Sequence, residues 1–178
     1  MSDTHVQRPT SGEYPADFEG YVSLVPEGDI LNVLRKQTED VLTLIKSVPE
    51  SRGGFRYAPE KWSIREVLGH VADGERIFAY RATCLARGEQ SELPGFDEND
   101  YVRTANFDGW SLADLAEQFE SLRRANIAVF KYLDDDGWSR SGIVNRYSIT
   151  VPAIAWAMAG HVRHHLRILE ERYGLQPR

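Results

Sequence analysis

The sequence is poor in cysteine and in basic residues, and each shortage excludes a class of protein. A single cysteine, Cys84, cannot close an intramolecular disulfide, so a secreted scaffold held by disulfides is excluded. The 21 lysines and arginines are outnumbered by 27 aspartates and glutamates. A net charge of −6 without a basic block argues against binding to nucleic acid or to an anionic membrane surface.

Long apolar runs and phosphate-binding loops are also missing. No run approaches the roughly 20 apolar residues that a transmembrane helix needs. The first residues have no apolar core of the signal-peptide kind, so we expect a cytoplasmic protein. No glycine-rich loop that would bind phosphates is present, and the run 134–136 lacks the alternating ligands of a calcium loop.

What is present is the composition of an ordinary globular chain. Of its 178 residues, 42% are hydrophobic and 27% are charged. A chain of this length buries enough surface to fold without a metal or a disulfide. We find no repeat and no change of composition, and we expect an irregular arm over 1–28, rich in proline and glycine, followed by one domain over 29–178.

Apolar residues at helical spacing predict four amphipathic helices, over 29–48, 63–87, 111–133 and 150–173. The start of the second is marked most clearly, because Ser63 and Glu66 form a capping box. In the third helix we place Leu122 and Val129 on the apolar stripe. No convincing strand pattern interrupts the helices, so the predicted fold is all-α, a four-helix bundle. The loop over 88–110 is long for a bundle, and loops of that length often act as lids.

The histidines carry the functional signal, with His5 in the arm set aside. His161 and His165 are four residues apart, which places both on one face of the fourth helix. That face is also the apolar stripe of Ile154, Met158, Val162, Leu169 and Tyr173, so both rings should point into the bundle. His164 is rotated off the stripe. His70 lies at the shoulder of the stripe of the second helix.

Two imidazoles side by side in an apolar interior need partners for their nitrogens, and each unsatisfied one costs about 1–3 kcal/mol. A divalent metal bound by both rings meets this need, and His70 is the obvious third ligand. The same pattern is also compatible with hydrogen-bonded core histidines. The spacing alone does not decide between the two interpretations.

Two segments resemble the DinB/YfiT-like family. One is 61–81, which contains W-S-x-x-E-x-x-x-H from Trp62 to His70, and the other is 159–166, which contains G-H-x-x-x-H. The resemblance extends over about 25–173. It implies a four-helix bundle, usually dimeric, in which His70, His161 and His165 hold a divalent metal. Members of the family are linked to thiol S-transfer with bacillithiol, mycothiol or glutathione, and many have no assigned reaction.

Three neutral imidazoles would leave an open position on the ion, as in catalytic rather than structural sites. Zinc or nickel is the expected ion, although imidazole also suits iron and copper. The leading hypothesis is a metal-dependent transferase that activates a low-molecular-weight thiol for reaction with an electrophile. The alternatives are a metal-dependent hydrolase and a non-catalytic metal-binding stress protein. We expect a homodimer without nucleic-acid or membrane partners.

Several other residues are candidates around this site. Asp73 would orient His70 or bind the metal, whereas Glu75 is expected on a solvated helix face. Asp97 and Tyr101 are the best candidates for a lid in the long loop, and Asp97 is also a possible general base for hydrolysis. Arg81 would either pair with a substrate carboxylate or hold the acidic loop, and we favour the structural role. The four tryptophans, Trp62 among them, are expected in the core or in hydrophobic contacts at the start of a helix.

Overall fold

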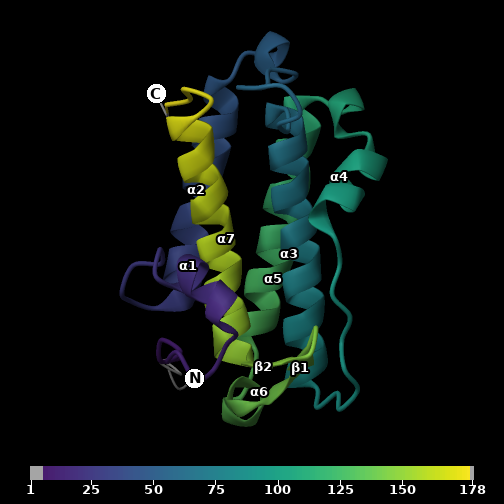
Figure 1. The fold of residues 1–178 in the computed structure, drawn as a ribbon. Helices are drawn as coiled ribbons and strands as arrows, with labels where there is room; N and C mark the ends of the chain where they lie inside the picture. The colour runs from purple at the N-terminus through teal and green to yellow at the C-terminus, as the bar shows by residue number, and fades with distance from the viewer. Residues whose placement is uncertain (1–5, 177–178) are drawn as a thin grey trace.

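The computed structural model describes residues 6–176, and four long helices form its body (Figure 1). They are α2 (Ile30–Ser47), α3 (Ile64–Ala86), α5 (Leu112–Lys131) and α7 (Val151–Glu171). The predicted four-helix bundle is confirmed, and the predicted helix limits lie within two residues of the observed ones. None of the helices in the described part of the chain is long and apolar enough to cross a membrane.

Each long helix begins where a polar side chain accepts a hydrogen bond from a backbone N–H of its first turn. The capping residues are Asp29, Ser63, Ser111 and Thr150. Such a cap typically contributes about 1 kcal/mol, because it satisfies one of the donors that a helix leaves unpaired. Ser63 and Glu66 form the predicted capping box, with both of its hydrogen bonds present. The local sequence therefore determines where the helices start.

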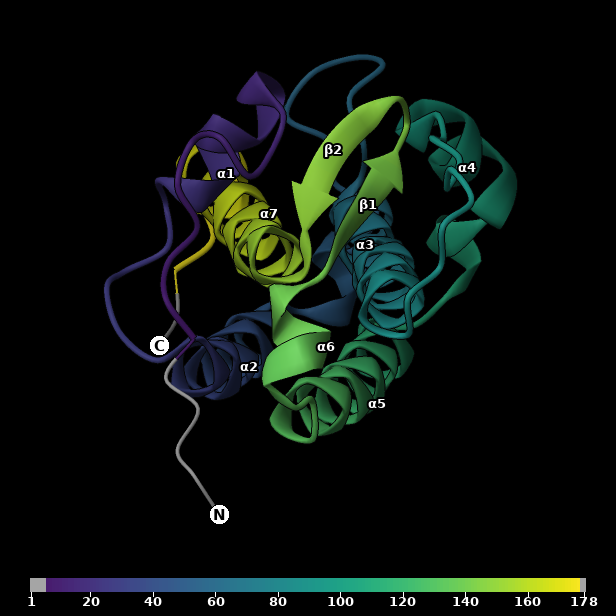
Figure 2. The ribbon, with the colours of Figure 1, turned by 90° about the horizontal axis from the view of Figure 1, so that it is seen from below.

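The order of the helices around the bundle places the histidines opposite one another. α3 packs against α7 and α5, and α2 packs against α5 and α7. The consecutive helices α2 and α3 therefore occupy opposite corners, as the view along the bundle shows (Figure 2). The helix that carries His70 is in this way a direct neighbour of the helix that carries His161 and His165.

The arm expected to be irregular contains short helical turns. These are η1 (Ala16–Phe18) and α1 (Glu19–Val22), and α1 packs against α7 (Figure 1). The contact depends on Gly160, because a Cβ atom there would lie 2.1 Å from the backbone oxygen of Tyr21. The arm is therefore part of the packed body of the protein, beside the helix of two histidines.

A β-hairpin, which we did not predict, precedes α7. Strands β1 (Ser141–Val144) and β2 (Tyr147–Thr150) pair antiparallel. The turn residues Asn145 and Arg146 both have positive φ, 48° and 71°, which is typical of a tight hairpin turn. The N–H of Leu93 donates to Ile143 and that of Asn145 donates to Leu93, each over 2.9 Å. These bonds fasten the start of the long loop to the hairpin.

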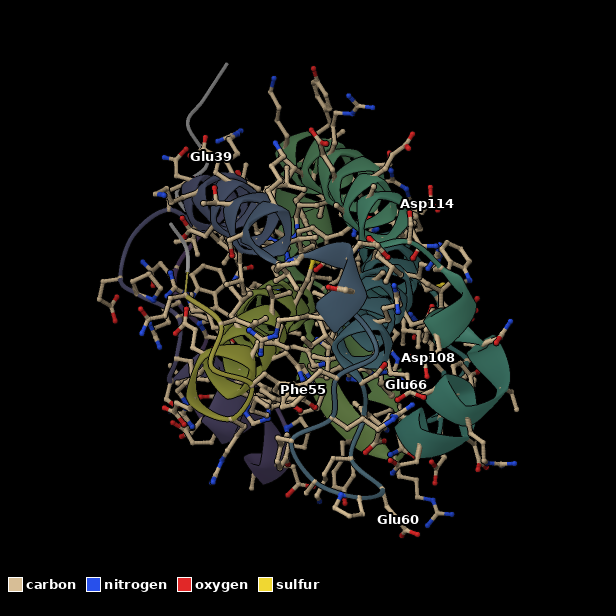
Figure 3. The ribbon with its side chains drawn as sticks, turned by 90° about the horizontal axis from the view of Figure 1, so that it is seen from above. Glu39, Phe55, Glu60, Glu66, Asp108 and Asp114 are labelled. Atoms are coloured by element: carbon tan, nitrogen blue, oxygen red, sulfur yellow. The ribbon has the colours of Figure 1, made fainter. Side chains whose placement is uncertain are left out.

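The long loop over 88–110 also contains structure of its own. It holds α4 (Glu98–Ala105) and η3 (Phe107–Gly109). Asp108 of η3 accepts a hydrogen bond from the Ser63 hydroxyl, and Arg56 bridges Asp108 and Glu66. Glu66 and Asp108 lie together beside the start of α3 (Figure 3). The loop is therefore tied to the body of the protein at both ends. The chain also turns through η2 (Glu50–Arg52) and α6 (Asp135–Ser139).

The core consists of two apolar clusters, and buried polar residues lie between them. Arg123 is fully buried and donates two hydrogen bonds to the Glu75 carboxylate, over 2.8 and 2.6 Å. Asn126 donates to the same carboxylate, and Arg123 also donates to Gln37. We call these four residues the ion-pair cluster.

The ion-pair cluster corrects two predictions. Glu75 does not lie on a solvated face: only 1% of it is exposed, because Arg123 and Asn126 supply the partners that make its burial possible. In α5, Arg123 and Asn126 are buried where we expected Leu122, and both Leu122 and Val129 are only half-buried. In this part of α5 the buried face is therefore displaced from the predicted stripe, so that Arg123 and Asn126 face Glu75.

Candidate metal centre

The structure brings His70, His161 and His165 together between α3 and α7. One ring nitrogen from each lies within 4.8 Å of the others, and the Nε2 atoms of His70 and His161 are 2.9 Å apart. The exposed fractions of the three residues are 6%, 5% and 8%. His161 and His165 thus point into the bundle, as the helical pattern predicted.

These three rings have few hydrogen-bond partners. Within residues 6–176, their only hydrogen bond is the one between His70 and His161. Burial lowers the pKa of His70 to about 4, and it lowers the pKa values of His161 and His165 well below the usual value, with neighbouring histidines adding to the effect. All three rings are therefore neutral at neutral pH, with lone pairs available to a ligand.

This donor set suits a divalent transition metal. Nitrogens bound to zinc at about 2.1 Å in a tetrahedral site lie roughly 3.4 Å apart. The observed spacings, 2.9 Å for one pair and within 4.8 Å for all, need only small side-chain movements to reach that value. Three neutral imidazoles would leave the ion its full charge and at least one position for a substrate.

Aromatic side chains surround the three rings. The indole of Trp62 lies 4.8 Å from the ring of His70 and stacks on His165 at 6.4 Å. The Tyr173 hydroxyl donates to the carbonyl of Trp62 over 2.6 Å. Trp62, which we expected in the core or in a hydrophobic contact at the start of a helix, therefore also forms a wall of the candidate centre.

Gly74 provides the space for His161. A Cβ atom on Gly74 would lie 2.6 Å from Cε1 of His161, so a larger residue would collide with the imidazole. The structure shows that His161 fills the space.

The N-terminal arm covers the candidate centre, which the sequence analysis missed. The ring of Tyr21 lies edge-on to His161 at 5.6 Å and to His164 at 5.5 Å. Burial raises the pKa of Tyr21, with a smaller contribution from Glu98. The available signal was the glycine before His161, since a glycine inside a helix often marks the close approach of another segment.

A cavity of about 360 Å³ opens beside the three histidines, a volume within the usual range for small-molecule sites. Its lining includes the three histidines, His164, Trp62, Phe78, Arg81, Phe96, Glu98 and Tyr147. His164 is half-buried and reaches this cavity although it is rotated off the apolar stripe. The arm, α3, α7, the long loop and the hairpin all contribute to the wall.

The other predicted site residues lie apart from the three rings. Asp73 accepts a hydrogen bond from Arg76 over 3.1 Å, and Asp97 caps α4 through the N–H groups of Asn99 and Asp100. Tyr101 is 47% exposed and packs on another aromatic ring of the loop. None of these three candidates has a hydrogen bond or a ring contact with the histidines, and none lines the cavity. His5 lies outside the described residues.

Comparisons with known proteins agree with this architecture. The family model of the DinB superfamily matches residues 34–169. No curated protein matches the chain. One similar structure is YfiT from Bacillus subtilis, described as a probable metal-dependent hydrolase with an unusual four-helix bundle topology. It is 16% identical, with a TM-score of 0.69, over 96% of this chain and 95% of YfiT.

A second similar structure is the mycothiol-dependent maleylpyruvate isomerase, which is 15% identical with a TM-score of 0.65. The match covers 82% of this chain but only 61% of the isomerase. A histidine-to-alanine variant of the same enzyme matches at 14% identity. At these identities the likeness shows a shared fold, whereas the family model covers most of the chain. The chain belongs to the DinB superfamily.

Proposed function

We propose that His70, His161 and His165 hold a divalent transition metal, zinc or nickel, and that the protein is a transferase that activates a low-molecular-weight thiol. The observation that carries this proposal is the convergence of three buried, neutral imidazoles on the wall of a small-molecule cavity. A metal ion held there would lower the pKa of a thiol or a water bound to it.

The residues around the candidate centre favour thiol chemistry over hydrolysis. Activation of water usually also needs a general base within hydrogen-bond reach. No carboxylate of the described residues makes a hydrogen bond to the three histidines, and the acids that line the cavity, Asp17 and Glu98, are exposed. A thiol is acidic enough to ionise without such a base. The aromatic walls formed by Trp62, Phe78 and Tyr21 would keep water away from the sulfur.

The same three-histidine site is compatible with two alternative functions. A metal-dependent hydrolase is favoured by the likeness to YfiT, and Glu98 is then a candidate base, since Asp97 is engaged as a helix cap. A non-catalytic metal-binding protein would use the same three histidines. The homodimer expected from the resemblance is also a proposal, and light scattering of the purified protein tests it.

The test is turnover by the metal-loaded protein. Bacillithiol, mycothiol or glutathione is incubated with an alkylating electrophile, and loss of free thiol is followed for wild type and His161→Ala. We expect enzyme-dependent loss with at least one thiol in wild type and none above background in His161→Ala. Arg167→Gln, an exposed change on the same helix, serves as the control and should retain the activity.

The same preparations separate the alternatives. Hydrolysis of activated esters or amides without any thiol, abolished in His161→Ala, would favour the hydrolase. Bound metal without turnover of either kind would favour the binding protein.

A further inference from the structure

Arg81 is a buried cation on the wall of the cavity. It lies on α3 eleven residues after His70, about 16 Å farther along the helix. Only 8% of Arg81 is exposed, and its side chain lines the same cavity as the histidines. A guanidinium stays protonated in proteins, so this position places a full positive charge in a mostly buried setting.

Only one of the guanidinium nitrogens of Arg81 donates a hydrogen bond to the described residues. Nη2 donates to the carbonyl of Pro94 over 2.9 Å, and the guanidinium lies over the ring of Phe96 at 5.7 Å. Within residues 6–176, Nε and Nη1 have no hydrogen-bond partner, and no carboxylate forms an ion pair with Arg81. Nε and Nη1 are not sealed in the core either, and Arg81 is one of the residues that line the cavity.

A mostly buried guanidinium without a nearby anion is energetically unfavourable. Burial lowers the pKa of Arg81 because the charged form is poorly solvated there, and Tyr101 has a smaller opposing effect. By comparison, the fully buried Arg123 has Glu75 as its counter-ion. A buried charge normally has a partner of opposite sign, and for Arg81 none of the described residues supplies one.

The surroundings hold the guanidinium in place. Pro94 follows Leu93, whose N–H and C=O are both bonded to the hairpin. The next residue, Gly95, packs so closely on Asn145 that a Cβ atom there would lie 2.5 Å from Oδ1 of Asn145. The carbonyl that orients Arg81 is therefore fixed, and it holds the guanidinium at the wall of the cavity.

We propose that Arg81 binds the carboxylate end of an elongated substrate whose thiol end lies at the three histidines. This inference rests on the proposed function, and it adds the substrate class: a thiol with a carboxylate at its far end. The ring of His161 lies against Gly74, and Arg81 is seven residues farther along α3, about 10 Å. We therefore test thiols whose sulfur and carboxylate are separated by about that length.

The test compares two thiols of equal length. Binding of mercaptooctanoate and of mercaptooctanol to the zinc-loaded protein is measured by calorimetry under anaerobic conditions. We expect wild type to bind the carboxylate at least about tenfold more tightly, since hydrogen bonds to a charged group are stronger than those between neutral groups. Arg81→Gln should bind both thiols equally, and Arg81→Lys should keep part of the preference. Arg87→Gln, an exposed change at the end of the same helix, should keep all of it.

The outcomes separate this inference from the proposed function. Equal binding of the two thiols in wild type, with binding lost in His161→Ala, would overturn the role of Arg81 and leave the thiol site intact. A preference that persists in Arg81→Gln would also overturn it. If neither thiol binds, the proposed thiol function is wrong. Binding of octanoate, which has the carboxylate but no thiol, then tests the anion site by itself. Weaker octanoate binding in Arg81→Gln than in wild type would support the site, and equal or absent binding would refute it.

Discussion

Two buried polar clusters lie side by side in the bundle, and they differ in how completely the protein satisfies them. In the ion-pair cluster, the Glu75 carboxylate accepts three hydrogen bonds from Arg123 and Asn126. In the histidine cluster, three rings share one hydrogen bond among residues 6–176. The clusters are adjacent in the chain, because Glu75 follows Gly74, the residue against which His161 packs.

The difference indicates different roles. A buried charge with all its partners fixes the packing of helices, here joining α3 and α5 and, through Gln37, α2 and α7. Ring nitrogens that have few partners within the chain and border a cavity are available to a ligand from outside the chain. We therefore propose that the ion-pair cluster stabilises the bundle and that the histidine cluster binds a ligand.

The largest effect on stability is expected for Arg123→Met. The substitution leaves the Glu75 carboxylate buried without its counter-ion, and breaking such a pair costs about 3–5 kcal/mol. Urea unfolding of the metal-free protein measures the loss. The double variant Glu75→Gln, Arg123→Met should recover part of it. A loss below about 1 kcal/mol for the single variant would show that the pair does not stabilise the bundle.

Acid should destabilise the metal-free protein through the histidine cluster. An unfolded histidine takes up a proton below its usual pKa of 6.5, whereas folded His70 stays neutral down to about 4. The unfolded state then binds more protons, so the free energy of unfolding falls as the pH drops from 6.5 to 4, on the order of 3 kcal/mol for His70. Urea unfolding at several pH values measures this fall. His70→Gln should show a shallower pH dependence, and equal slopes for both proteins would contradict the assignment.

A smaller loss is expected for Gly160→Ala. Its new Cβ atom would meet the backbone oxygen of Tyr21, so the arm must move away from the histidines. Overpacking of this kind costs about 1–3 kcal/mol. Limited proteolysis should cut the arm faster in this variant, while Gly20→Ala, a position with open space, should resemble wild type. Equal cleavage rates in all three proteins would argue against this tight contact.

The smallest effect on stability is expected for Gly74→Ala, which should act on the histidine cluster. The new methyl group collides with the imidazole of His161, and displaced ligand geometry typically lowers metal affinity by about 10–100-fold. The side chain of His161 can move aside, unlike the backbone that a Cβ atom at Gly160 meets, and helix propensity gains about 1 kcal/mol. The stability of the metal-free protein should therefore change little. Competition with a zinc chelator measures the affinity. Unchanged affinity would show that Gly74 does not position His161 for a metal.

The sequence was most informative where the physical cause is local. Capping residues and apolar spacing predicted the four helices, and the spacing of His161 and His165 placed both rings in the interior. The hairpin was missed because its strands are four residues long and its turn is Asn145-Arg146, without the glycine that usually marks such turns.

The pairing of distant residues could not be read from one helix at a time. Glu75 falls on the buried face of α3 between Val71 and Phe78, and Arg123 lies 48 residues away on α5. A charge on the inner face of each of two helices was the available signal. The contacts of the arm with His161 and of the hairpin with the long loop likewise depend on the tertiary fold.

The central claim is that the histidine cluster holds a metal and the ion-pair cluster does not need one. The most direct measurement is elemental analysis of gently purified wild type, His161→Ala and His164→Ala, followed by zinc titration at neutral pH. The account predicts close to one transition-metal ion per chain in wild type and His164→Ala, and none in His161→Ala. Wild-type protein that contains no metal and takes up none on titration would contradict it, and the three histidines would then be core residues.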